Sequence, residues 1–186
     1  MRYNVDFELC SLVFLLLLTV QYFGMRRFPN KQNRLFGWAL LCAIADILLD
    51  VVSAYAIMYA AVVPVWLNYL ANALFYALQI AFPGVMCIYV AVLADLNGPR
   101  YRPLLLLVVP AAFFVGLLLV NPFTGWIYSI PLVDGVRTYV YGKLFYTLYY
   151  GTAIYVVAGL AMAFIWHRRL ERKQFFAFVA FVICGV

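Results

Sequence analysis

The chain has 186 residues, of which 68% are hydrophobic and only 11% are charged, and its formal net charge is +6. In soluble domains about a quarter of all residues are charged. This composition, with a mean hydropathy of +0.99, therefore excludes a soluble globular domain and predicts an integral membrane protein. The apolar segments are long and lack the period-two alternation of barrel strands, which predicts an all-α membrane fold.

Six segments are predicted as membrane-spanning helices, because a span needs roughly 17 to 25 apolar residues. The sixth is short: from Gln174 to Val186 a helix rises about 20 Å, whereas the hydrocarbon core is about 30 Å thick. We therefore expect that the chain is a fragment and that the natural polypeptide continues beyond residue 186. The predicted spans are residues 7–25, 35–59, 67–94, 104–120 and 143–166, and a truncated segment opening at Gln174.

Basic residues concentrate in the connections after the first, third and fifth spans, which hold four, two and four of the chain's thirteen lysines and arginines. The positive-inside rule places these connections in the cytoplasm, so the N-terminus faces outward and a seventh helix would return the chain to the cytoplasm. Short basic loops beside membrane ends predict contact with anionic lipid headgroups rather than nucleic acid. These residues are Arg26, Arg27, Lys31, Arg34, Arg100, Arg102, Arg168, Arg169, Arg172 and Lys173.

The connection from Asn121 to Gly142 is long and lies outside in this topology. Its sequence WIYSIPLVDGVRTYVY contains two short β-prone runs around Asp134 and Gly135, a dipeptide typical of hairpin turns. We expect a small extracellular β-hairpin between the fourth and fifth spans. The hairpin either covers the helix ends as a lid or contacts a ligand, since long loops are often functional.

Two prolines fall inside predicted spans, Pro83 in the third and Pro110 in the fourth. Each is expected to remove a backbone hydrogen bond and to favour a kink. Neighbouring groups can satisfy the freed carbonyl, which leaves such a kink without consequence. A hinge for signalling is the alternative.

Two carboxylates, Asp46 and Asp50, lie inside the second span. Counted from the cytoplasmic end at Leu35, they are about 16 Å and 22 Å deep, near the midplane and in the outer half of the membrane. Residues four apart share a helix face. Because two charges repel in a low dielectric, we expect at least one aspartate to be protonated unless a cation or a donor faces the pair.

Amide side chains on the third span are the predicted partners of these carboxylates. Asn68, Asn72 and Gln79 recur at helical spacing, and Gln79 falls at about the depth of Asp46. We expect a polar seam between the second and third spans, with Glu8 of the first span at its mouth. The seam serves either as interhelical hydrogen bonding, at roughly 1 kcal/mol per bond, or as a ligand pocket open toward the outside.

Three tyrosines, Tyr146, Tyr149 and Tyr150, crowd the outer half of the fifth span next to the predicted hairpin. Aromatic residues near a membrane surface typically form an anchoring belt. A tyrosine-lined mouth of a ligand site beneath the hairpin is the alternative.

The sequence lacks the residue patterns of a catalytic or metal centre. His167 is the one histidine and has no cysteine nearby, so zinc spacing fails. The four cysteines are scattered over separate spans and are predicted to be inert packing residues. We expect no cofactor, no metal and no catalytic residue in this chain.

Five stretches carry a resemblance to a known class of proteins: YNVDFELCSLVFLLLLTVQYF, RRFPNKQNRLF, ADILLDVVSAY, LNYLANALFYALQ and NPFTGWIY. Over its whole length the chain resembles the N-terminal membrane region of bacterial signalling proteins, where a seven-helix input module like that of sensor histidine kinases precedes a GGDEF diguanylate cyclase domain. The resemblance implies an input module coupled to cyclic di-GMP turnover or to a histidine kinase. No GGDEF, EAL or kinase signature occurs here, so no enzyme activity is carried onto any residue.

Two functions follow as expectations. The first is a sensor in the bacterial cytoplasmic membrane that detects a small extracellular or membrane-borne ligand through the seam or the hairpin. It would signal to a cytoplasmic output domain, and we expect a homodimer because such signalling commonly works through a change in dimer geometry. The alternative is a transporter or permease subunit in which Asp46 and Asp50 bind protons or cations.

Overall fold

The computed structural model describes residues 5–24, 31–96, 107–133, 135–172, 174–176 and 178–179, and within them it has the predicted all-α fold. Four of its helices are long and apolar enough to cross a membrane, whereas α4, with 17 residues, is shorter. The helices are α1 (Asp6–Gly24), α2 (Lys31–Met58), α3 (Val65–Leu93), α4 (Val108–Thr124), α5 (Thr147–Ile165) and the 3₁₀ turn η2 (His167–Arg169).

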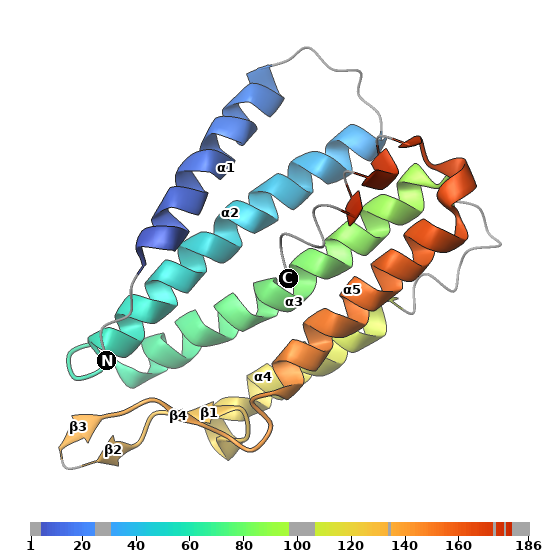
Figure 1. Cartoon of the computed structure of the whole chain (residues 1–186). Helices are drawn as coiled ribbons and strands as arrows, with labels where there is room; N and C mark the ends of the chain where they lie inside the picture. The colour runs from blue at the N-terminus through green and yellow to red at the C-terminus, as the bar shows by residue number, and fades with distance from the viewer. Residues whose placement is uncertain are drawn as a thin grey trace.

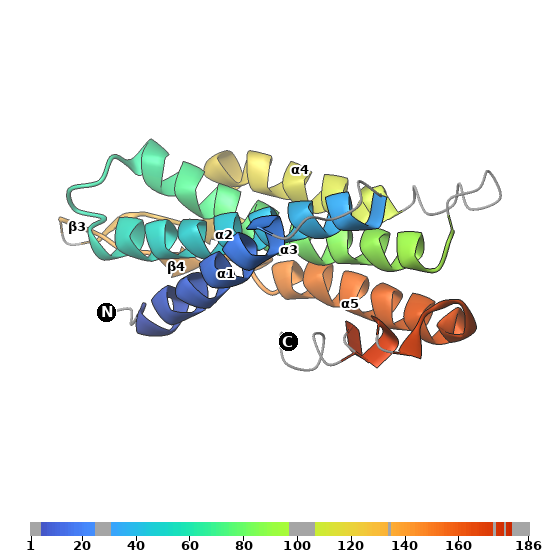
Figure 2. The same ribbon diagram turned by 90° about the horizontal axis from the view of Figure 1, so that it is seen from above.

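Helix α3 is the centre of the described fold. It packs against α2, α4 and α5 (Figure 1), and Figure 2 shows α4 and α5 flanking it. The buried apolar core lies between α3, α4 and α5, where Ile80, Phe114 and Tyr155 are almost completely enclosed. Many large apolar side chains remain exposed on the outer faces, as expected for helices that face lipid.

Helix α1 is attached more loosely. It packs mainly on α2, and Tyr22 is its one buried residue among those described. The Tyr22 hydroxyl donates to the Asn33 carbonyl, and its ring lies beside Gly37, where a Cβ would be 3.4 Å from it. The joint between the two helices is therefore near the end of α1 and the start of α2.

A small β-hairpin joins α4 to α5, as predicted from the sequence. Strand β1 (Tyr128–Ser129) pairs with β4 (Val140–Tyr141), and β2 (Leu132–Val133) pairs with β3 (Val136–Arg137). Gly135 adopts φ +77° at the tip, a left-handed conformation that glycine tolerates best. Asp134, the other half of the predicted turn, lies outside the described residues.

The two ends of the helical bundle differ in charge. Figure 1 places the start of α1 and the β-hairpin at one end, and the start of α2 and η2 at the other. The latter end carries the exposed side chains of Lys31, Arg34, Arg168 and Arg169.

The helix bounds correct three predictions. Helix α2 begins at Lys31, four residues before the predicted start. Helix α4 runs on to Thr124 and ends at Gly125, whose φ of +62° and bond to the Asn121 carbonyl at 2.8 Å form its C-cap. Asn121, predicted to begin the loop, is therefore helical, and Pro122 lies inside the same helix. Helix α5 begins at Thr147 instead of residue 143, because residues 143–146 form turns.

The two prolines behave differently from one another. Pro83 lies inside α3, which continues unbroken to Leu93. Pro110 is the third residue of α4, in a first turn whose N–H groups have no acceptor within the helix. The prediction that Pro110 removes a helical hydrogen bond is therefore wrong for α4 as described. The predicted sixth span falls mostly outside the described residues.

Candidate ligand cavity

Buried amide side chains form hydrogen bonds across the interface between α2 and α3. Asn68 Nδ2 donates to the Ala56 carbonyl at 2.7 Å, and Asn72 Nδ2 donates to Asn68 Oδ1 at 2.8 Å. The Ser53 hydroxyl donates to Asn72 Oδ1 at 2.9 Å. All three polar side chains are buried, and these bonds pair them with each other and with the backbone. Asn68 and Asn72 thus form the interhelical network that the first interpretation of the seam predicts.

The two aspartates lie outside this network. Asp46 is half-buried, and its Oδ1 has no hydrogen-bond partner among the described residues; the same holds for Oε2 of Glu8 on α1. Asp50 lies close enough to both carboxyl groups for mutual repulsion. The described residues hold no His, Cys, Asp and Glu group arranged to bind a metal. The structure therefore brings the three acids near one another without a cation from the described part of the chain.

Asp50 and Gln79 meet at a cavity of about 190 Å³ between α2, α3, α5 and the base of the β-hairpin. Asp50, Ser53 and Gln79 supply polar groups from the two neighbouring helices. Aromatic side chains from α3, the β-hairpin and the start of α5 supply most of the remaining wall. The lining residues are Asp50, Ser53, Ala54, Ile57, Phe75, Tyr76, Gln79, Tyr139, Tyr141, Phe145 and Tyr149.

The β-hairpin is held over this cavity by tyrosines. The hydroxyls of Tyr76 on α3 and Tyr139 in the β-hairpin are 3.1 Å apart. Tyr139 stacks on Tyr128 with ring centroids 5.3 Å apart, and Tyr128 stacks on Tyr69 of α3 at 5.5 Å. The Tyr128 hydroxyl donates to the Tyr69 carbonyl at 3.0 Å, while the Ile130 N–H donates to the Tyr69 hydroxyl at 3.2 Å. These stacked rings and hydrogen bonds hold the β-hairpin, which covers the cavity, against α3.

Burial changes the acidity of the two β-hairpin tyrosines. Desolvation, followed by the proximity of Tyr76 and Tyr69, raises the pKa of Tyr128. Desolvation also raises the pKa of Tyr139, and Tyr76 adds to the effect through its charge and its hydrogen bond. Both phenols therefore stay protonated at physiological pH.

The three tyrosines predicted on the fifth span separate in the structure. Tyr149 lines the cavity. Tyr146 and Tyr150 are 69% and 65% exposed and do not line it, which suits the anchoring belt. Tyr155, farther along α5, is buried: its hydroxyl accepts from the Ala111 N–H at 2.9 Å and donates to the Leu107 carbonyl, so it caps the start of α4.

Sequence reasoning missed several residues that build the site. Asn121 of α4 accepts from the Ile127 N–H at 2.8 Å and donates to the Tyr128 carbonyl at 3.0 Å, which anchors the base of the β-hairpin. Tyr139 and Phe145 line the cavity although they lie in the loop. The aromatic richness of residues 138–150 was the available signal for the lining. No signal distinguished Asn121 from an ordinary loop residue.

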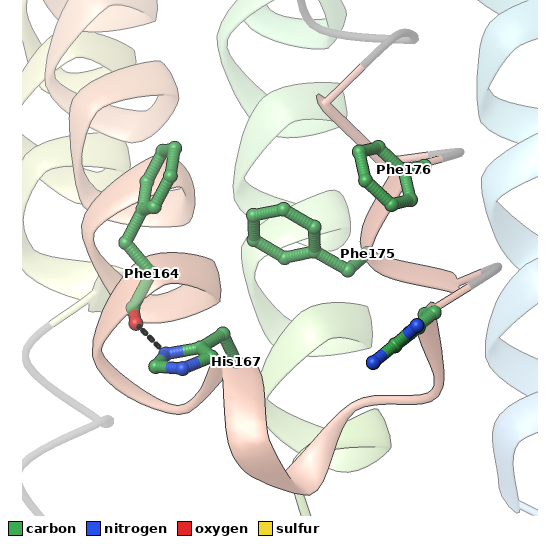
Figure 3. Close-up of a pocket in the computed structure, with 5 residues that line it drawn as sticks. Phe164, His167, Phe175 and Phe176 are labelled. Atoms are coloured by element: carbon green, nitrogen blue, oxygen red, sulfur yellow. Dashed lines mark hydrogen bonds between the residues drawn. The ribbon is translucent and has the colours of Figure 1, made fainter.

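Two further cavities lie toward the basic end. One of about 450 Å³ is lined by Phe164, His167, Arg172, Phe175 and Phe176 (Figure 3). His167 Nδ1 donates to the Phe164 carbonyl, in the last turn of α5, at 2.8 Å, so one of the two imidazole nitrogens is hydrogen-bonded to the backbone. The other, of about 270 Å³, adjoins Lys31, Arg34 and Trp38. Neither contains a predicted site residue.

Comparison with protein-family models, with curated proteins and with solved structures finds no match to this chain.

Proposed function

We propose that this chain is a membrane sensory module whose ligand binds in the cavity beneath the β-hairpin. In this proposal the module lies in the bacterial cytoplasmic membrane, with six spans in the present chain and an extracytoplasmic N-terminus. The concentration of basic side chains at the end opposite the β-hairpin supports that orientation. The cavity then opens on the outer side and receives a small extracellular or membrane-borne ligand.

The observation that carries the proposal is that one cavity joins three helices to the β-hairpin. Asp50 on α2, Gln79 on α3 and Tyr149 on α5 line it together with Tyr139 of the β-hairpin. A ligand that binds one arrangement of these elements better than another would shift the position of α5. Helix α5 leads directly to η2 at the opposite end. In this proposal the sixth and seventh spans come next, and the cytoplasmic output domain, a diguanylate cyclase or a histidine kinase, follows them.

The test uses the full-length protein in cells, with cyclic di-GMP level or kinase autophosphorylation as the output. Asp50→Asn and Gln79→Leu change the cavity, and we expect each to alter the output at unchanged membrane abundance. Tyr150→Phe removes a hydroxyl from an exposed residue that does not line the cavity, so it should leave the output unchanged. Unaltered output in both cavity variants would contradict the sensory proposal.

One observation favours transport as a second candidate. Asp46 Oδ1 is buried without a hydrogen-bond partner among the described residues, a property of carboxylates that bind protons or cations inside membranes. If the chain transports, proteoliposomes should show a proton or cation flux that Asp46→Asn abolishes. The sensory proposal predicts no such flux.

A further inference from the structure

We infer that the cavity beneath the β-hairpin binds a small alkylated ammonium cation. The inference rests on the proposal that this cavity is the ligand site, and it adds the chemical class of the ligand. Three features of the lining lead to it: the charge, the aromatic walls and the volume.

The described lining of the cavity holds an acidic group and no basic one. Among the described residues that line it, Asp50 has the one carboxyl group, and none is Lys, Arg or His. No described residue pairs with the Asp50 carboxyl group, and Glu8 and Asp46 place two further carboxyl groups nearby. The described basic residues of this end, Arg137 and Lys143, do not line the cavity. A carboxylate withdrawn from water is costly unless a positive group compensates it, so the site favours a cation over a neutral or anionic ligand.

The aromatic walls suit a cation that carries apolar groups. Tyr76, Tyr139, Phe145 and Tyr149 line the cavity, and Phe145 meets the Tyr76 ring edge to face at 6.1 Å. Aromatic faces attract cations, and cages of such rings recognise quaternary ammonium groups. Rings alone would accept any apolar ligand. The carboxylate beside them makes the choice specific, because methylated nitrogen gives both a positive charge and an apolar surface.

The volume limits the size of the cation. Cavities for drug-sized ligands measure roughly 300 to 1,000 Å³, and this one measures about 190 Å³. At about 30 Å³ per water, it corresponds to about six water molecules, which matches a ligand with a similar number of non-hydrogen atoms. Choline and related amines have this size. The same headgroup chemistry occurs free in solution or attached to a phospholipid.

Binding of choline to the purified chain in phosphatidylglycerol nanodiscs tests the inference by calorimetry. We expect choline to bind and its uncharged carbon isostere, 3,3-dimethylbutan-1-ol, to bind at least about tenfold more weakly, the ratio that one contact of roughly 1.4 kcal/mol produces. Asp50→Asn and Tyr139→Leu should each weaken choline binding by about tenfold or more. Asp95→Asn removes the same charge from an exposed residue at the other end of α3, and it should have no effect.

Each outcome decides between defined alternatives. Equal binding of the isostere, or choline binding that survives Asp50→Asn, overturns the cation assignment, as does the absence of choline binding to the unaltered chain. Tyr139→Leu keeps the test valid if Asp50→Asn does not fold. Nanodiscs that contain phosphatidylcholine should block free choline if the headgroup is lipid-borne and should leave it unaffected if the ligand is soluble. The sensory proposal is judged separately, by the output of Gln79→Leu, so the two can fail independently.

Discussion

Asn121 of α4 binds both backbone polar groups of Tyr128, the first residue of the β-hairpin. Its Oδ1 accepts from the Tyr128 N–H at 3.2 Å, and its Nδ2 donates to the Tyr128 carbonyl at 3.0 Å. Both residues are completely buried. A single amide side chain near the end of α4 therefore fixes the position of the first residue of the β-hairpin, which covers the cavity.

Replacement of Asn121 by Ala should loosen the β-hairpin. It removes the side chain that satisfies the Ile127 and Tyr128 N–H groups, and each buried donor left unsatisfied costs about 1 to 3 kcal/mol. We expect a lower melting temperature and faster proteolysis within residues 127–141. Leu119→Ala, at a 69% exposed position of the same helix, is the control. Equal protease resistance of Asn121→Ala and the unaltered chain would show that the anchor is dispensable.

Gly151 should not tolerate even a methyl group. A Cβ there would lie 2.9 Å from the ring of Phe114, which is buried between α4 and α5. We expect Gly151→Ala to destabilise the chain by about 1 to 3 kcal/mol, as overpacking does, measured by unfolding in mixed detergent micelles.

Gly116 provides the matched control, because a Cβ at this position of α4 would meet no described atom within 4 Å. Gly116→Ala should be neutral or should stabilise the helix by up to about 1 kcal/mol. Phe114→Leu should rescue Gly151→Ala. The packing argument is wrong if both glycine variants unfold at the same denaturant concentration.

The bond between Ser53 and Asn72 should couple α2 to α3. In a double-mutant cycle of Ser53→Ala and Asn72→Ala, we expect a coupling energy of about 0.6 kcal/mol and no more than about 1.7, the range found for such bonds in membranes. The cycle is measured by unfolding of the four proteins under one condition. Zero coupling would mean that Asn72 acts only through its bond to Asn68.

The β-hairpin should open in alkali. The raised pKa values of Tyr128 and Tyr139 mean that the folded chain holds these protons more tightly than the unfolded chain. Their stabilising contribution is therefore complete below the unfolded pKa of about 10 and is lost as the pH rises beyond it. We expect tyrosinate absorbance to appear late, together with protease sensitivity of the β-hairpin. Tyr139→Phe should remove one late-titrating group; if every tyrosine titrates near pH 10 in the folded chain, the burial argument fails.

How far the sequence predicted this structure depended on the kind of signal. Four long apolar helices followed from composition, because apolar length alone determines whether a segment can cross a membrane. The β-hairpin followed from the Asp134–Gly135 dipeptide, since its turn requires unusual backbone angles that few residues adopt. The end of α4 did not follow, because the apolar run stops at Val120 whereas the helix continues to Thr124, where Gly125 forms the C-cap.

The site was predicted only in part, because local spacing identifies polar residues on one helix face but not their partners on another helix. Helical spacing identified Asn68, Asn72 and Gln79 as one polar series, but it did not show that the first two bond to each other and to α2 while the third reaches a cavity. That division depends on which α2 residues lie opposite, namely Ser53 and Ala56 rather than the aspartates. Contacts between distant segments, such as that of Tyr76 with Tyr139, have no local pattern.

The capping of α4 by Tyr155 bears on the biogenesis of the chain. The Ala111 N–H and the Leu107 carbonyl bond to a hydroxyl that comes 44 residues after Ala111. A ribosome supplies the N-terminal segments first, so these two backbone groups lack their partner until α5 has been synthesised. In lipid an unsatisfied backbone group is expensive. In the proposed topology, where α4 crosses the membrane, we therefore expect its stable insertion into the bilayer to require α5, so that the two helices insert together.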